Sequence, residues 1–354
     1  MKIAIVNDLM MAVEALRRVV RSRPDYTVAW VARDGAEAVK KCAADRPDMI
    51  LMDLIMPVMN GAEATRHIMR DSPCPILVVT ATVDGNISLV FEAMGYGALD
   101  AVNTPVLGTD GKLTGAQALL RKIEIIGHLI ARPAPTSPAE AMEFRGLPTS
   151  KGHLPLIVLG ASTGGPAALA DILSRLPALV NAAMVITQHI DKEFSNDLAL
   201  WLGTHCPLKV KVATPGCRPE PGTVWLAGTN DHLVLTKHGT LEYRVAPAEC
   251  FYRPSVDVFF KSVATHWSPP GVAVLLTGMG RDGGEGLLAL RQCGWRTLAQ
   301  DKATSIVYGM PRAEADLLAA EKILPLNAIA DAIMQGIETR IINPIQDDHG
   351  KHKR

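Results

Sequence analysis

A serine in a glycine-rich turn is the chain's clearest chemical feature. Residues 160–166 read Gly-Ala-Ser-Thr-Gly-Gly-Pro and directly follow the apolar run 154–159. We expect a strand, a sharp turn and a helix, because glycines permit the turn and Pro166 suits the first helical turn. A serine hydroxyl exposed at such a turn becomes a nucleophile when a base lies within hydrogen-bond distance. The pattern predicts nucleophilic hydrolysis at Ser162.

A base for this serine should lie at the end of a neighbouring strand. His189 directly follows the apolar run 182–188, so it should project from the same sheet edge as Ser162. His232 is the competing candidate, but its Asn-Asp-His context is typical of a turn. Position along the chain favours His189.

A carboxylate should in turn orient the base. Asp282 stands in a glycine-rich turn after the apolar run 272–276, and Asp301 is an alternative acid. The same turn exposes backbone N–H groups, and that of Met279 is the candidate donor to an oxyanion.

Two considerations weigh against assigning residues 160–166 to a simple esterase. The order serine, histidine, aspartate differs from the serine, aspartate, histidine order of α/β-hydrolases. The turn could instead hold a phosphate at a helix N-terminus, although it lacks the lysine of a P-loop and the G-x-G-x-x-G spacing.

A second group of polar residues lies in the first 80 residues. Asp8, Asp53 and Thr80 each follow a predicted strand, and ligands bind at this edge of a doubly wound sheet. Two carboxylates and a hydroxyl can hold Mg²⁺ while one carboxylate accepts a phosphoryl group. Alternatively, Asp8 and Thr80 cap helices, and residues 56–61 form a turn.

Alternating strand and helix patterns predict an α/β protein with two doubly wound domains. The first domain should have a five-stranded parallel, flavodoxin-like sheet, and the second a mostly parallel sheet with a β-hairpin. The expected boundaries are 1–125, a proline-containing linker at 126–152, 153–345, and a polar tail at 346–354. The expected strands are 3–6, 27–31, 49–52, 76–79, 98–102, 154–159, 182–187, 223–227, 272–276 and 295–299, with a hairpin of 233–235 and 241–244. Expected helices cover 9–20, 35–45, 62–70, 86–95, 117–130, 256–263 and 284–292.

Composition narrows the classes of function. The formal net charge is zero, so no general affinity for nucleic acid or anionic membranes is indicated. Six cysteines are scattered without a C-x-x-C pair, which argues against a disulfide framework or a zinc site. The chain shows neither a signal peptide nor an apolar run long enough to span a bilayer, and we expect a cytoplasmic protein.

The string Met-Asp-Leu-Ile-Met-Pro-Val-Met-Asn-Gly at 52–61 resembles the phosphoacceptor segment of response-regulator receiver domains. The resemblance covers about residues 1–125 and implies that a histidine kinase of the CheA type phosphorylates Asp53, that Asp8 helps to bind Mg²⁺, and that Thr80 is a switch residue. The chain departs from the pattern at Asn7, where an acid is usual, at Thr104, where a lysine is usual, and at Ala101, where an aromatic residue is usual.

The second half resembles the catalytic domain of chemotaxis protein-glutamate methylesterases, the CheB family. The motifs that carry the likeness are 160–166, 188–189, 252–257, 276–283 and 300–311. The resemblance implies that Ser162 attacks the γ-methyl ester of a methylated chemoreceptor glutamate, that His189 and Asp282 serve as base and orienter, and that the Met279 N–H binds the oxyanion.

By the same resemblance, Thr163 adds a supporting hydrogen bond, and specific receptor glutamines are deamidated. Arg253 either recognises the acidic receptor helix or forms a structural salt bridge. The esterase chemistry needs no cofactor, and the unphosphorylated receiver should cover the Ser162 face. The chain looks most like the Wsp-type, surface-sensing branch. The alternative function is a non-enzymatic or pseudo-receiver signalling module that binds a receptor or kinase.

Overall fold

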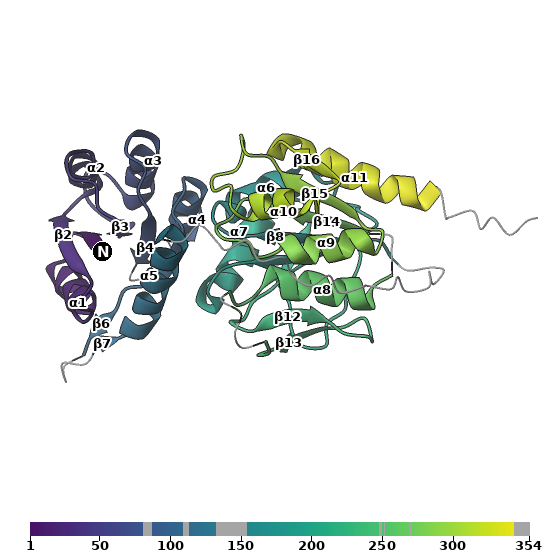
Figure 1. Ribbon diagram of the computed structural model, residues 1–354, viewed down its shortest axis with the longest axis horizontal. Helices are drawn as coiled ribbons and strands as arrows, with labels where there is room; N and C mark the ends of the chain where they lie inside the picture. The colour runs from purple at the N-terminus through teal and green to yellow at the C-terminus, as the bar shows by residue number, and fades with distance from the viewer. Residues whose placement is uncertain are drawn as a thin grey trace, which may run out of the picture.

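The computed structural model describes residues 1–80, 87–108, 113–131, 154–247, 250, 252–268 and 271–342. Figure 1 shows two α/β domains side by side, the N-terminal one in purple and blue and the C-terminal one in teal to yellow. The predicted fold class is confirmed for both domains, because each is built on a parallel sheet with helices packed against it.

The N-terminal domain contains a five-stranded parallel sheet in the order β2-β1-β3-β4-β5. Its strands are β1 (Lys2–Val6), β2 (Thr27–Ala32), β3 (Met49–Met52), β4 (Ile76–Thr80) and β5 (Asp100–Asn103). Its helices are α1 (Met10–Arg21), α2 (Gly35–Ala44), α3 (Gly61–Asp71), α4 (Ile87–Gly95) and α5 (Ala116–Ala131), and a short antiparallel pair joins β6 (Val106–Leu107) to β7 (Leu113–Thr114).

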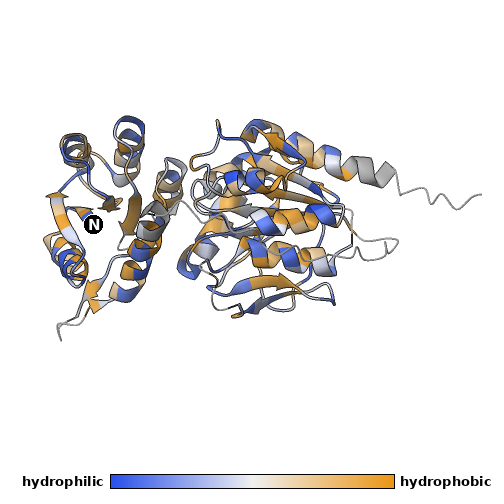
Figure 2. Cartoon of the chain, viewed as in Figure 1, coloured by the Kyte–Doolittle hydropathy of each residue, from blue (hydrophilic) through white to orange (hydrophobic). Residues whose placement is uncertain are grey.

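The central strands of this sheet are buried because apolar helix faces pack on both sides of it. All residues of β3 and β4 are buried, as expected for parallel strands between helices. On one face Ile3 and Leu51 pack with Leu16 of α1 and Ile123 of α5, whereas the other face packs against α2, α3 and α4. The apolar strands stand out in orange in Figure 2.

The C-terminal domain contains a seven-stranded parallel sheet in the order β10-β11-β9-β8-β14-β15-β16. Its strands are β8 (Leu156–Ala161), β9 (Ala183–Gln188), β10 (Lys209–Val212), β11 (Thr223–Leu226), β14 (Gly271–Leu275), β15 (Arg296–Gln300) and β16 (Lys322–Leu324). The predicted hairpin is present as the separate antiparallel pair β12 (His232–Leu235) and β13 (Leu241–Arg244). The helices are α6 (Gly165–Arg175), α7 (Ser195–His205), α8 (Val256–His266), α9 (Gly284–Gln292), α10 (Met310–Leu317) and α11 (Leu326–Ile342), with a 3₁₀ turn η1 (Lys192–Phe194).

Helix α5 continues to Ala131, six residues past the end that the sequence predicted for the first domain. The first residues of the predicted linker are therefore helical, because the apolar periodicity of α5 runs on to the proline-rich stretch. The rest of the predicted linker up to residue 152, and the predicted tail 346–354, lie outside the described residues. Within the part of the chain that is described, no helix is long and apolar enough to cross a bilayer.

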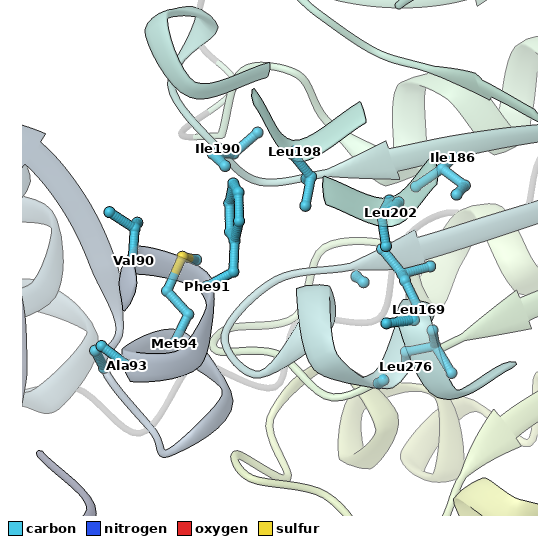
Figure 3. Packing of buried hydrophobic residues seen from close by; sticks show 14 of the residues in the cluster. Val90, Phe91, Ala93, Met94, Leu169, Ile186, Ile190, Leu198, Leu202 and Leu276 are labelled. Atoms are coloured by element: carbon cyan, nitrogen blue, oxygen red, sulfur yellow. The ribbon is translucent and has the colours of Figure 1, made fainter. Parts of the chain in front are cut away.

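The two domains meet mainly through α4 of the first domain and α6 and α7 of the second. Phe91 of α4 is buried and its ring lies 5.2 Å from the ring of Trp201 on α7. Figure 3 shows Phe91 pointing from α4 toward Ile190 and Leu198 of the C-terminal domain. The apolar core is therefore continuous across the domain boundary.

Candidate active site

Three loops at the carboxyl edge of the second sheet bring the predicted residues together. Ser162 follows β8, the strand at the centre of the sheet, and β9 and β14 lie on either side of it. His189 follows β9, and Asp282 lies in the loop between β14 and α9. Parallel strands end at the same edge, so residues far apart in sequence meet where the strand order reverses.

The turn after β8 requires glycine at two positions. Gly164 has a φ of +78°, which L-residues rarely adopt, and it begins helix α6. A Cβ on Gly165 would stand 2.0 Å from Oε1 of Gln188. The Gln188 amide in turn donates from Nε2 to the carbonyl oxygen of Ser162, 2.8 Å away. This buried glutamine therefore fixes the serine turn to the end of β9.

His189 and Asp282 are in direct contact. Nε2 of His189 lies 2.7 Å from Oδ2 of Asp282, and both side chains are only 9% exposed. Nδ1 of His189 is buried and has no hydrogen-bond partner among the described residues. Nδ1 is thus the ring nitrogen left to receive a proton from a nucleophile.

The carboxylate of Asp282 is held at the beginning of helix α8. Oδ2 accepts from the backbone N–H of Val256 (2.7 Å), and Oδ1 accepts from the Ser255 hydroxyl (2.8 Å) and the N–H of Asp257 (3.1 Å). Burial opposes ionisation of Asp282, but the hydrogen bonds from His189, Ser255 and this backbone hold its pKa below the usual value. Asp282 is therefore an anion that can fix the orientation of the imidazole.

An aromatic ring covers one face of the His189 imidazole. The Tyr252 ring stacks on His189 with centroids 4.2 Å apart and planes at 5°. The Tyr252 hydroxyl donates to the carbonyl oxygen of Met279 at 3.3 Å. Burial raises the pKa of Tyr252, so the phenol stays protonated as a donor. The motif 252–257 by itself predicts no role for Tyr252 or Ser255, although a serine just before a helical pattern is a recognisable N-cap.

The structure places the two competing candidates elsewhere. His232 is fully buried, and its ring nitrogens contact the carbonyl oxygen of Pro247 and the N–H of Ser255 rather than Ser162. Asp301 accepts hydrogen bonds from the N–H and hydroxyl of Thr304, so it stabilises a turn after β15. Neither residue contacts His189 in the described structure.

A cavity of about 260 Å³ opens over Ser162 and lies between the two domains. The C-terminal domain lines it with the predicted site residues and their neighbours, namely Ser162, Thr163, His189, Ile190, Asp191, Asn230, Tyr252, Arg253 and Met279. Arg253 and Met279 thus border the same cavity as Ser162.

The N-terminal domain forms the other wall of this cavity, with Leu99, Asp100, Ala118, Arg121, Lys122, Ile125 and Ile126. The hydroxyl of Thr163, the residue after Ser162, donates to the carbonyl oxygen of Leu99 at 3.2 Å. Nearby, Nζ of Lys122 lies 2.6 Å from Oδ2 of Asp100 in a largely buried ion pair. A segment just before β5 therefore touches the catalytic turn itself.

The acidic site of the first domain lies at the carboxyl edge of its sheet. Asp53 follows β3, is 7% exposed and accepts the N–H of Leu54 at 2.8 Å. Burial, with a further contribution from the Asp8 carboxylate, raises the pKa of Asp53 to about 6. Ala101, which stands where receiver domains usually have an aromatic residue, is a buried residue of β5.

Two threonine hydroxyls at this edge of the sheet are buried without a partner among the described residues. They belong to Thr80, at the end of β4, and to Thr104, whose N–H donates to the carbonyl oxygen of Thr80. The Asn7 side chain instead accepts the N–H of Leu9. The described chain holds no cluster of three or more acidic, histidine or cysteine side chains that could form a metal site. Any Mg²⁺ here would rely on two carboxylates, backbone oxygen and water, which is common for this ion.

Comparison with known proteins matches both domains. Residues 157–333 match the CheB methylesterase family, and residues 3–112 match the response regulator receiver domain. A protein-glutamate methylesterase/protein-glutamine glutaminase of Bordetella avium is 54% identical over 331 residues, which is 93% of this chain and 95% of that protein. One of Pseudomonas aeruginosa is 50% identical over 336 residues, covering 95% and 99%.

A solved structure supports the match of the C-terminal domain. The CheB methylesterase catalytic domain of Thermotoga maritima is 32% identical and covers 52% of this chain and 99% of its own, with a TM-score of 0.50. The chain therefore belongs to the CheB methylesterase family, and it carries a response regulator receiver domain ahead of the catalytic domain.

Proposed function

We propose that this protein is a phosphorylation-regulated protein-glutamate methylesterase that hydrolyses glutamate γ-methyl esters on chemoreceptors. The observation that carries the proposal is the contact of His189 with the buried, ionised Asp282 beside the Ser162 turn. Relatives more than 50% identical over nearly the whole chain bear the corresponding names. No comparable observation favours a purely binding function.

In the proposed reaction, Ser162 Oγ attacks the ester carbonyl carbon while its proton passes to Nδ1 of His189. Asp282 stabilises the imidazolium through Nε2. The Met279 N–H, with Thr163 in support, would stabilise the negative carbonyl oxygen. Collapse of the tetrahedral intermediate transfers the proton to the leaving methoxide and releases methanol.

Water completes the cycle by the same route. His189 takes a proton from water, the hydroxide attacks the acyl-enzyme, and the Ser162 oxygen leaves with the proton. The product is the free glutamate side chain. Deamidation of a receptor glutamine would follow the same steps, with ammonia in place of methanol, and neither reaction requires a cofactor.

The receiver is proposed to regulate access to this site. Residues of its β5 and α5 form one wall of the cavity, and the carbonyl oxygen of Leu99 accepts the Thr163 hydroxyl. A receptor helix therefore cannot reach Ser162 without displacing the receiver domain. Phosphorylation of Asp53 by a CheA-type histidine kinase would loosen this face, with Thr80 as the switch residue. The receptor's cytoplasmic domain and the kinase are thus the proposed partners, and they would place the protein in the cytoplasm.

Mg²⁺ is the proposed cofactor of receiver phosphorylation, with Asp8 and Asp53 as its carboxylate ligands. The ion would neutralise charge while the phosphoryl group is transferred. The buried Thr80 and Thr104 hydroxyls offer donors for phosphoryl oxygens where related domains have a lysine. Membership of the Wsp-type branch stays a prediction from sequence.

Arg253 is proposed to bind the acidic surface of the receptor helix, because it lines the cavity beside Ser162. An Arg253→Gln variant should then raise KM for the receptor more than it lowers kcat. An unchanged KM would leave Arg253 as a structural residue.

Methanol release from methylated chemoreceptor tests the function directly. The wild type should release methanol, and Ser162→Ala should lose this activity. Ser174→Ala is a matched control, because Ser174 lies on α6 and its hydroxyl donates within the helix to the carbonyl oxygen of Asp171. No release by the wild type would refute the enzyme assignment, and undiminished release by Ser162→Ala would refute the nucleophile.

A further inference from the structure

His232 lies at the start of β12 and contacts Ser255, which in turn contacts Asp282. Its side chain is fully buried. Nδ1 lies 3.2 Å from the backbone nitrogen of Ser255, and Nε2 lies 3.1 Å from the carbonyl oxygen of Pro247. An amide nitrogen can only donate and a carbonyl oxygen can only accept, so Nδ1 accepts and Nε2 carries the proton. This environment fits one neutral tautomer of His232.

Ser255 links this histidine to the Asp282 carboxylate. Its backbone N–H donates to His232, and its hydroxyl donates to Oδ1 of Asp282 at 2.8 Å. The same hydroxyl oxygen accepts the N–H of Val258 at 3.2 Å, as an N-cap of α8. The Ser255 backbone must therefore be held in one place for its hydroxyl to serve both groups.

Strand β12 is anchored on α8 at its other end as well. The N–H of Leu235 donates to the Ser262 hydroxyl at 2.9 Å, and Leu233 and Leu235 are buried in the core beneath. Because both ends of β12 are tied to α8, His232 meets Ser255 from a rigid support. A displacement of the imidazole would therefore displace Ser255 rather than strand β12.

We infer that His232 is a positioning residue of the esterase: in its neutral tautomer it fixes Ser255, and through the Ser255 hydroxyl it aims the Asp282 carboxylate at His189. His232 touches no reacting atom. The inference rests on the proposed function, since it concerns the orientation of the same Asp282 carboxylate. It assigns a role in catalysis to a histidine that sequence position alone offers only as a rival base.

The two amide substitutions of His232 separate its two nitrogens. Asparagine places a carbonyl oxygen near the position of Nδ1 and can still accept the Ser255 N–H, whereas glutamine reaches toward Nε2 and lacks that acceptor. We expect His232→Asn to retain kcat within about threefold. His232→Gln should lose kcat on the order of tenfold with KM nearly unchanged, because a misplaced catalytic group slows the chemical step.

Two further variants exclude a merely structural effect. Val234→Ala removes buried methyl groups from the same strand without touching the Ser255 contact, and it should lower Tm without lowering kcat. In Ser255→Ala the hydroxyl is gone, so adding His232→Gln to it should cost less than His232→Gln costs the wild type. The downfield imidazole N–H resonance of His189 should shift in His232→Gln and keep its wild-type position in Val234→Ala.

The outcomes distinguish this inference from the proposed function. An active wild type with equal kcat values for His232→Asn and His232→Gln, whether both high or both low, would overturn the positioning role. Additive effects of His232→Gln and Ser255→Ala would overturn the route through Ser255. A wild type that releases no methanol would instead refute the function, and the resonance of His189 would still report on the contact.

Discussion

Nε2 of His189 lies 2.7 Å from Oδ2 of Asp282, although 93 residues separate the two in the chain. The contact forms because β9 and β14 lie on opposite sides of β8 and end at the same edge of the sheet. The first turn of α8 then surrounds the carboxylate with three donors. A helix N-terminus favours negative charge, so the fold itself keeps Asp282 ionised despite its burial.

Asp282→Asn should lower kcat by about 10³- to 10⁴-fold with little change in KM, because the amide no longer stabilises the imidazolium and disturbs the tautomer of His189. Methanol release from methylated receptor measures this loss. Asp301→Asn is the control, because Asp301 caps a turn after the next strand and has no contact with His189. Equal activity of Asp282→Asn and the wild type would show that the contact has no part in catalysis.

That Ser162, His189 and Asp282 lie near one another could be predicted, because each follows a clear strand signal. Ser162, His189 and Asp282 all stand just after buried apolar runs, and a parallel sheet brings such positions to one edge. The same rule favours His189 over His232, which begins a hairpin strand, but it does not separate Asp282 from Asp301, which also follows a strand. The contacts themselves, such as that of Ser255 with Asp282, join loops 27 residues apart and leave no periodic pattern in the sequence.

Other parts of the fold escaped prediction for physical reasons. Strand β10 (Lys209–Val212) is a short edge strand with half-exposed side chains, so it shows little apolar signal. Helix α7 follows η1 without a side-chain N-cap, and its buried residues are few. The bond from Thr163 to Leu99 depends on how two domains dock, which no local pattern specifies.

Phe91→Ala should raise the basal esterase activity of the full chain by about tenfold. Phe91 packs against Trp201 across the domain boundary, and losing about 1.4 kcal/mol of this aromatic packing shifts a closed–open equilibrium tenfold. The measurement is methanol release without a phosphodonor. Met11→Ala is the control, since Met11 is an exposed apolar residue of the receiver on α1. Activity that stays at the wild-type level in Phe91→Ala would argue that the closed interface does not restrain the enzyme.

Asp53→Asn should abolish phosphoryl uptake from a small-molecule phosphodonor such as acetyl phosphate and leave the receiver folded. Asparagine keeps the oxygen that accepts the Leu54 N–H, but its amide cannot form an acyl phosphate. Intact-mass analysis measures the uptake, and circular dichroism checks the fold. Asp48→Asn serves as the control, because Asp48 accepts the N–H of Lys2 at the opposite edge of the sheet. Labelling of Asp53→Asn to the wild-type extent would place the phosphoryl group on another residue.

Glu314→Gln should remove a pH dependence from the stability of the catalytic domain. Glu314 is 1% exposed on α10, its Oε2 accepts the N–H of Ala320, and burial raises its pKa to about 7. The folded state therefore keeps a proton that the unfolded state releases near its ordinary pKa of 4.5. The resulting stability is fully present below pH 4.5 and is lost as the pH rises past 7.

The wild type should therefore lose about 2 kcal/mol of unfolding free energy relative to Glu314→Gln between pH 5 and pH 8, because most of the interval between the two pKa values of Glu314 lies in this range. Urea unfolding followed by tryptophan fluorescence at the two pH values measures the difference. Glu321→Gln changes an exposed carboxylate beyond the same helix, so its curve should run parallel to that of the wild type. Parallel curves for Glu314→Gln and the wild type would mean that Glu314 is already ionised at pH 5, with its charge solvated in the folded protein.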